Sequence, residues 1–198
     1  MRTTGTLTED SPQVRRAIRA LARELRSHHR ATAEHSHRLA GLCRRLADRI
    51  GLDPMAATEV EIVAVLHDVG KLAIEPEILD HPGKLDDLQR HKMRRHTIEG
   101  QDILVHVAGL EHLGVIVRAT HEHWDGGGYP DGLSGTDIPI EARIVSVADA
   151  YDAMTSSRAY RPALSHEEAC RRVERDSGGQ FDPLVAAALL DLLATESR

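Results

Sequence analysis

The chain has 198 residues, which suits one domain with a single substantial core. A formal charge of −6, from 25 basic and 31 acidic residues, excludes a global positive field able to hold a long nucleic acid, although a small anionic ligand stays compatible. Phe, Trp and Tyr make up 3% of the chain, so the core must be built from Ala, Leu, Val and Ile, which favours helices.

The first part of the chain predicts three successive helices. A capping serine followed by proline opens a helix over residues 11–29. An apolar stripe over residues 39–50 predicts a second helix, which a glycine then ends. An Asp-Pro pair opens a third helical segment over residues 53–68, and its strongly apolar run leads directly into adjacent His67 and Asp68. A carboxylate in such a position needs a partner, because a buried unpaired charge is costly.

The middle of the chain alternates helices with breaks. The tetrapeptide "HPGK" interrupts the chain, after which residues 85–107 predict one polar helix that carries His96. Residues 110–122 predict a further helix with His121 near its end. Residues 124–139, "WDGGGYPDGLSGTDIP", are so rich in Gly, Asp and Pro that we expect an ordered loop or a short hairpin.

The last part of the chain is helical again. Residues 140–154 are strongly apolar and place Asp149 and Asp152 on one helical face. Ser165 and Glu168 form the pattern of a capping box, and a final Asp-Pro pair opens the last helix. We therefore expect a single all-α bundle.

The sequence also bears on the compartment. Residues 1–10 are polar, and no stretch reaches the length of a membrane span. Cys43 and Cys170 form no close-spaced pair, so we interpret both as buried thiols rather than as a disulfide. We expect a cytoplasmic protein with no membrane association.

His and Asp residues recur on apolar helix faces or at helix ends, in separate helical segments: His35, His67, Asp68, His96, His121 and Asp149. A helical bundle builds a metal site in its core from such facing side chains. Imidazole with carboxylate suits iron, manganese or zinc, and a bridging Asp68 would let two ions share a hydroxide. Most of the 13 His residues are instead interpreted as surface or satisfied core residues.

Each of these signals also has a structural interpretation. His67 and Asp68 alone could form a structural hydrogen bond, but a second buried carboxylate in another apolar helix favours a common cation. Lys71 could steady a phosphate oxygen or interact with the helix dipole. Arg158 and Arg161 belong to a short basic cluster that suits phosphate, with a solvated surface as the alternative.

Taken together, these motifs resemble the HD-GYP family of bacterial metal-dependent phosphodiesterases, within the HD-domain phosphohydrolase superfamily. The segment "LHDVGK" is similar to the family's HD motif and "HEHWDGGGYPDGLSG" to its signature loop, and the match runs over roughly residues 30–190. The resemblance implies an all-α HD-domain bundle with a long Gly/Pro-rich GYP loop. We expect a flexible tail over residues 1–10, an N-terminal helix over 11–29 and the HD-GYP domain over 30–195.

The resemblance implies hydrolysis of cyclic di-GMP to pGpG, with further cleavage to GMP left open, through a hydroxide that bridges two divalent ions. It implies iron or manganese first, with zinc, nickel or magnesium as alternatives. The metal ligands carried over are His35, His67, Asp68, His96, His121 and Asp149. The catalytic residues are His67, Asp68 and Lys71, and the substrate-binding residues are Lys71, Tyr129, Arg158 and Arg161.

Departures from the family pattern keep a second hypothesis open. Thr120 stands where the family usually has a His, so the second ion loses one imidazole unless water or Glu122 takes that position. Ala31 replaces a Glu found in members with a third metal. The alternative is a catalytically degenerate member that binds cyclic di-GMP, or signalling proteins through the GYP loop, without turnover. An HD phosphohydrolase for another nucleotide and a homodimer are also left open.

Overall fold

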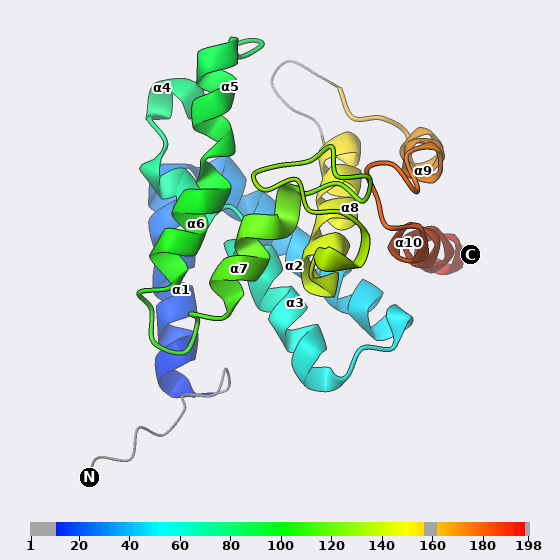
Figure 1. Ribbon diagram of the computed structural model, residues 1–198, viewed down its shortest axis with the longest axis horizontal. Helices are drawn as coiled ribbons and strands as arrows, with labels where there is room; N and C mark the ends of the chain where they lie inside the picture. Colours follow the sequence, from blue (N-terminus) through cyan, green and yellow to red (C-terminus); the bar gives the residue numbers. More distant parts are fainter. Residues whose placement is uncertain (1–10, 157–161, 197–198) are drawn as a thin grey trace.

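The computed structural model describes residues 11–156 and 162–196, and within these ranges its regular structure is helical, which confirms the expected all-α class (Figure 1). The longer helices are α1 (Pro12–His28), α2 (Arg30–Ile50), α3 (Pro54–Leu66), α8 (Ile140–Thr155), α9 (His166–Arg175) and α10 (Pro183–Glu196). The shorter ones are η1 (Val69–Ala73), α4 (Pro76–Leu79), α5 (Asp87–Arg94), α6 (His96–Leu104), α7 (Leu113–Arg118), η2 (Ala119–His121) and η3 (Gly135–Asp137). No helix in the described ranges combines the length and apolar character that crossing a membrane requires.

The core lies where α2, α3 and α8 pack together, with α1 and α10 against α2. Its side chains are mainly aliphatic, and Leu39, Leu46, Val63, Ile144 and Leu189 are fully buried. Burying each such side chain stabilises the fold by about 1.5–3 kcal/mol. The aliphatic composition is therefore sufficient to build the bundle that positions the polar site.

Local capping signals explain where the first helices begin. The side chain of Ser11 accepts a hydrogen bond from the N–H of Val14, and that of Asp53 accepts from the N–H groups of Met55 and Ala56. These bonds satisfy donors that the first turn of a helix leaves free. The predicted starts of α1 and α3 are thus confirmed.

Other predicted boundaries are wrong. The single helix expected over residues 85–107 is divided into α5 and α6 at Arg95, whose N–H bonds to the carbonyl of Lys92 in a tight 3₁₀ pattern. Ser165 caps α9, but the carboxylate of Glu168 pairs with arginines of its own helix, so the reciprocal half of the capping box is missing. Cys43 is buried as expected, whereas Cys170 is partly exposed.

A close crossing of η1 and α6 joins the end of α3 to His96. A Cβ atom on Gly70 would overlap the carbonyl oxygen of His96 and the backbone N of Gly100. Only a residue without a side chain permits this approach. The glycine after His67-Asp68 therefore has a structural role, because it brings the HD motif next to α6.

The Gly-rich segment is an ordered loop rather than a hairpin. Buried Glu122 lies beneath it and accepts hydrogen bonds from the N–H groups of Asp131 and Gly132. A Cβ atom on Gly128 would overlap the backbone of Glu122. At its first residue, the loop is fixed by a hydrogen bond from the N–H of Trp124 to the carbonyl of Gln180. The loop is thus held over the end of η2, where His121 lies.

Candidate metal centre

The six His and Asp residues singled out from the sequence reach one region of the bundle from different elements. Asp68, which is 3% exposed, lies at the middle of the site. Its Oδ2 is 3.4 Å from Nε2 of His67, and its Oδ1 is 3.5 Å from Nε2 of His96. Each oxygen of this carboxylate therefore faces a different histidine, which is the arrangement that a bridging ligand requires.

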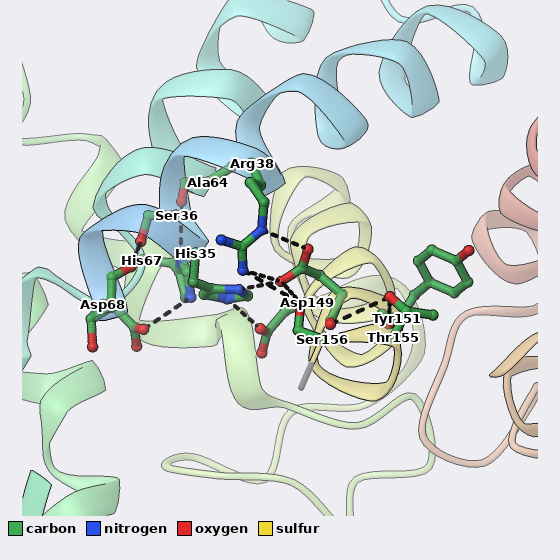
Figure 2. A network of polar contacts seen from close by, with 12 residues as sticks. His35, Ser36, Arg38, Ala64, His67, Asp68, Asp149, Tyr151, Thr155 and Ser156 are labelled. Carbon is green, nitrogen blue, oxygen red and sulfur yellow. Dashed lines mark hydrogen bonds and ion pairs between the residues drawn. The ribbon is translucent and has the colours of Figure 1, made fainter. Parts of the chain in front are cut away.

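One side of the site, which we call the acidic half, consists of His35, His67, Asp68, Asp149 and Asp152. His35 lies between two carboxylates of α8: its Nε2 is 2.8 Å from Asp149 and its Nδ1 is 2.6 Å from Asp152. Figure 2 shows His35 extending from α2 towards Asp149. Burial alone would lower the pKa of His35, but hydrogen bonds to the two carboxylates raise it to about 9.

Asp152 connects His35 to the surface. One oxygen of Asp152 accepts from Nδ1 of His35 and lies 3.3 Å from a guanidinium nitrogen of Arg38. The hydroxyl of Ser156 lies 3.4 Å from the same oxygen. A carboxylate in this position fixes which ring nitrogen of the histidine points inward. Asp152 thus contacts His35 directly, whereas Arg38 contacts Asp152 and acts on His35 only through it.

The opposite side, which we call the imidazole half, consists of Asp68, His96 and His121. Nδ1 of His96 donates to the carbonyl of Met93 at 2.7 Å, which turns Nε2 towards Asp68. Nε2 of His96 and of His121 are buried without a hydrogen-bond partner. Burial is the main cause that lowers the pKa of His96 to about 3 and of His121 to about 4. Both rings are therefore neutral near pH 7 and offer lone pairs.

Lys71 lies beside the shared carboxylate. Its Nζ is 2.7 Å from Oδ2 of Asp68. Burial would raise the pKa of Asp68, but the charges of His67 and Lys71 hold that pKa well below its usual range. Lys71 is one-fifth exposed, so its ammonium lies at the boundary between the buried carboxylate and solvent.

Tyr129 of the loop covers the imidazole half. Its ring is stacked on that of His121, with centroids 5.2 Å apart and an interplanar angle of 8°. The guanidinium of Arg94 lies 4.9 Å from the centre of the Tyr129 ring. Arg158 and Arg161, which we expect to bind substrate, lie outside the described residues.

The structure changes the interpretation of Thr120 and Glu122. Thr120 is buried, and its hydroxyl donates to the carbonyl of Val117 at 2.8 Å. Glu122 holds the loop backbone through Oε1, whereas its Oε2 is buried without a hydrogen-bond partner. That Glu122 could take the position of the missing histidine therefore stays a prediction.

The donor set fits a divalent metal. Ligand atoms of His35, His67 and Asp68 lie within 4.8 Å of one another, and so do those of Asp68, His96 and His121. Imidazole and carboxylate are ligands for iron, manganese and zinc. Buried ring nitrogens without a partner are costly unless something binds them, which supports the fit.

Sequence reasoning missed the roles of Asp152, Arg38 and Arg94. A signal was present for the first two, because Asp152 lies three residues after Asp149 and Arg38 three residues after His35, each on a shared helical face. Arg94 gave no comparable signal, since its contact with Tyr129 joins segments that are distant in sequence.

Comparisons with known proteins identify the family to which this chain is similar. A family model described as an HD domain matches residues 19–185. The chain is 40% identical over 163 residues to a cyclic di-GMP phosphodiesterase of Thermotoga maritima, covering 81% of this chain and 44% of that protein. It is 38% identical over 173 residues to a 3'3'-cGAMP-specific phosphodiesterase of Vibrio cholerae, covering 86% of this chain and 33% of that protein.

A solved structure supports the fold. The HDG"Y"P protein Bd1817 from Bdellovibrio bacteriovorus superposes with a TM-score of 0.67 at 24% identity, over 82% of this chain and 52% of that chain. At this identity the likeness concerns the fold alone. The chain spans less than half the length of the two curated relatives, so their activities belong to longer proteins.

Proposed function

This chain belongs to the HD domain family, and from that membership we propose that it is a metal-dependent phosphodiesterase that hydrolyses cyclic di-GMP to linear pGpG. The observation that carries the proposal is the position of Asp68, which faces histidines on two sides. Relatives named as phosphodiesterases of cyclic dinucleotides support the substrate class. The intact Gly-rich loop beside the site supports it further.

Two divalent ions would be held by the chain's own residues. His35, His67, Asp68 and Asp149 would hold the first ion, and Asp68, His96 and His121 the second. Iron or manganese suits these ligands. Such ions supply Lewis acidity towards a phosphoryl oxygen and lower the pKa of a bound water.

Lys71 would change partners during the reaction. In the structure its ammonium is paired with Asp68 at 2.7 Å. With Asp68 engaged as a metal ligand, Nζ of Lys71 would be free to donate to a non-bridging oxygen of the phosphate. A donor aimed at developing negative charge lowers the barrier most where water is excluded.

The loop and the basic residues would hold the rest of the substrate. Tyr129, whose ring is stacked on that of His121, would help to exclude water from the imidazole half. Arg158 and Arg161 would pair with the substrate's phosphates, because a guanidinium matches the geometry of phosphate oxygens.

A single experiment tests the proposal. The protein is purified without oxygen, loaded with Mn²⁺ or Fe²⁺, and its bound metal is counted while cyclic di-GMP and 3'3'-cGAMP are followed by chromatography. We expect two ions per chain and conversion of cyclic di-GMP to pGpG, and the same chromatogram reads any GMP. Full metal loading without cleavage of either nucleotide would refute the enzyme.

A binding module without turnover is the second candidate. Thr120 favours it, because the position where the family usually has a histidine holds a buried hydroxyl that already donates to the carbonyl of Val117. The second ion would then be held weakly. Retained affinity for cyclic di-GMP with no product in excess Mn²⁺ would select this candidate.

A further inference from the structure

One face of α5 carries positive charge beside the candidate metal centre. Asp87, Arg90, His91 and Arg94 lie at positions i, i+3, i+4 and i+7, so they share a face of this helix. They line an open cavity of about 360 Å³, which we call the α5 cleft. Asp87 pairs with Arg90 at 2.5 Å, whereas Arg94 forms no ion pair with a carboxylate of the described residues.

Arg94 connects the α5 cleft to the candidate metal centre. Its guanidinium lies over the Tyr129 ring, which is stacked on His121. The last turn of α5 is also tied to His96 by the hydrogen bond from Nδ1 to the carbonyl of Met93. In Figure 1, α5 leads directly into α6, where His96 is the first residue. The cleft therefore adjoins the imidazole half.

We propose that the α5 cleft, through Arg94, binds the phosphodiester of a cyclic dinucleotide that is not being cleaved. The proposal rests on the proposed function, in which one of the two phosphates of the substrate lies at the metal ions. The other phosphate needs a cation within the substrate's reach, and Arg94 would supply one in addition to Arg158 and Arg161. A guanidinium offers a planar fork of donors to phosphate, and its place over an aromatic ring keeps it oriented. Binding a remote phosphate positions the reacting one.

The test compares a substrate with two phosphates and a substrate with one. Arg94→Ala is assayed with cyclic di-GMP and with bis(4-nitrophenyl) phosphate, which has no second phosphate. We expect KM for cyclic di-GMP to rise at least about tenfold, as for loss of a charged hydrogen bond. We expect kcat/KM for the small diester to stay within about twofold, because its phosphate does not reach the cleft. An equal loss on both substrates would overturn the assignment.

Arg95→Ala is the matched control. Arg95 is the next residue, is exposed like Arg94, and pairs with Glu99 at 2.7 Å on α6. Its removal takes away the same charge near the same helix end. We expect KM for cyclic di-GMP to stay within about twofold of the unaltered protein. A rise as large as that of Arg94→Ala would show a diffuse charge effect and overturn a specific site.

A binding measurement separates this proposal from the proposed function. Cyclic di-GMP is titrated calorimetrically into the unaltered protein and Arg94→Ala in EDTA, where no metal is available for hydrolysis. We expect Kd to rise at least about tenfold in the variant. Equal affinities, or no affinity in the unaltered protein, would overturn the α5 cleft. Absent turnover in the metal-loaded protein would instead refute the enzyme and leave this comparison intact.

Discussion

The acidic half and the imidazole half of the candidate metal centre share Asp68 but differ in charge. In the acidic half, two carboxylates of α8 surround His35, whose pKa they raise to about 9 against the effect of burial. In the imidazole half, Asp68 is the one carboxylate in the His/Asp group, and burial lowers the pKa of His96 to about 3 and of His121 to about 4. The pKa of a histidine is thus raised in the acidic half and lowered in the imidazole half.

This difference in charge predicts how tightly each half would bind a cation. Ligand charge largely sets the affinity of a site for a divalent ion. Asp149 and Asp68 both act on the acidic side, whereas the imidazole half relies on neutral nitrogens and one shared oxygen. We therefore expect the acidic half to bind its ion more tightly. Thr120, in place of a histidine, would increase this difference in affinity.

Replacing Asp68 would have the largest effect, because it removes the carboxylate that we propose holds both ions. For Asp68→Ala we expect both ions to be lost and turnover of cyclic di-GMP to fall at least about a thousandfold. Metal counting after desalting and product chromatography measure this, with circular dichroism as the check that the bundle is folded. Hydrolysis at the unaltered rate would break the idea of a common ligand.

Replacing a proposed ligand that belongs to only one half would show whether each half binds its own ion. We expect Asp149→Ala to lose the tightly held ion and His121→Ala the weakly held one, so each variant would retain about one ion. Manganese titration followed by electron paramagnetic resonance distinguishes the remaining affinities. If both variants lost the same ion, the comparison between the halves would fail.

Adding a ligand would sharpen the comparison. For Thr120→His we expect the affinity of the second ion to increase at least about tenfold, since second-layer partners alone change metal affinity by that amount. Thr120→Val is the control, because it keeps the volume and removes a hydroxyl that is already bonded to Val117. A histidine variant that binds metal like the valine variant would mean that position 120 does not limit the second site.

Sequence reasoning succeeded where the signal is local. The starts of α1 and α3 were predictable because Ser11 and Asp53 cap the first turn that follows them in sequence. The division of residues 85–107 into two helices was not predictable, because a tight 3₁₀ turn replaces the helical pattern at Arg95 and redirects the chain. The crossing of Gly70 over α6 likewise depends on contacts formed only in the fold.

The candidate site shows the same limit. Helical spacing indicated that Asp149 and Asp152 share a face. It did not indicate that the two carboxylates would contact different ring nitrogens of His35. The positions of the His and Asp residues on apolar helix faces already predicted one metal site, and the resemblance to a known family implied the same ligands. That resemblance left out Asp152 and Arg94, because their contacts with His35 and Tyr129 join segments that no local pattern connects.

The smallest effects concern Asp152 and Arg38, which act on His35 and not on a metal ion directly. For Asp152→Asn we expect the affinity of the tightly held ion to fall about tenfold. The amide of the variant can still orient the ring of His35, but it lacks the negative charge that makes His35 basic. For Arg38→Gln we expect a change of at most about fivefold, since Arg38 is half exposed and its ion pair with Asp152 is screened by solvent. Manganese titration of both variants, with the imidazole half monitored as the internal reference, measures the two changes. Because Asp152 touches His35 and not His121, affinity in the imidazole half should stay unchanged; an equal loss in both halves would show that Asp152 stabilises the bundle rather than one ligand.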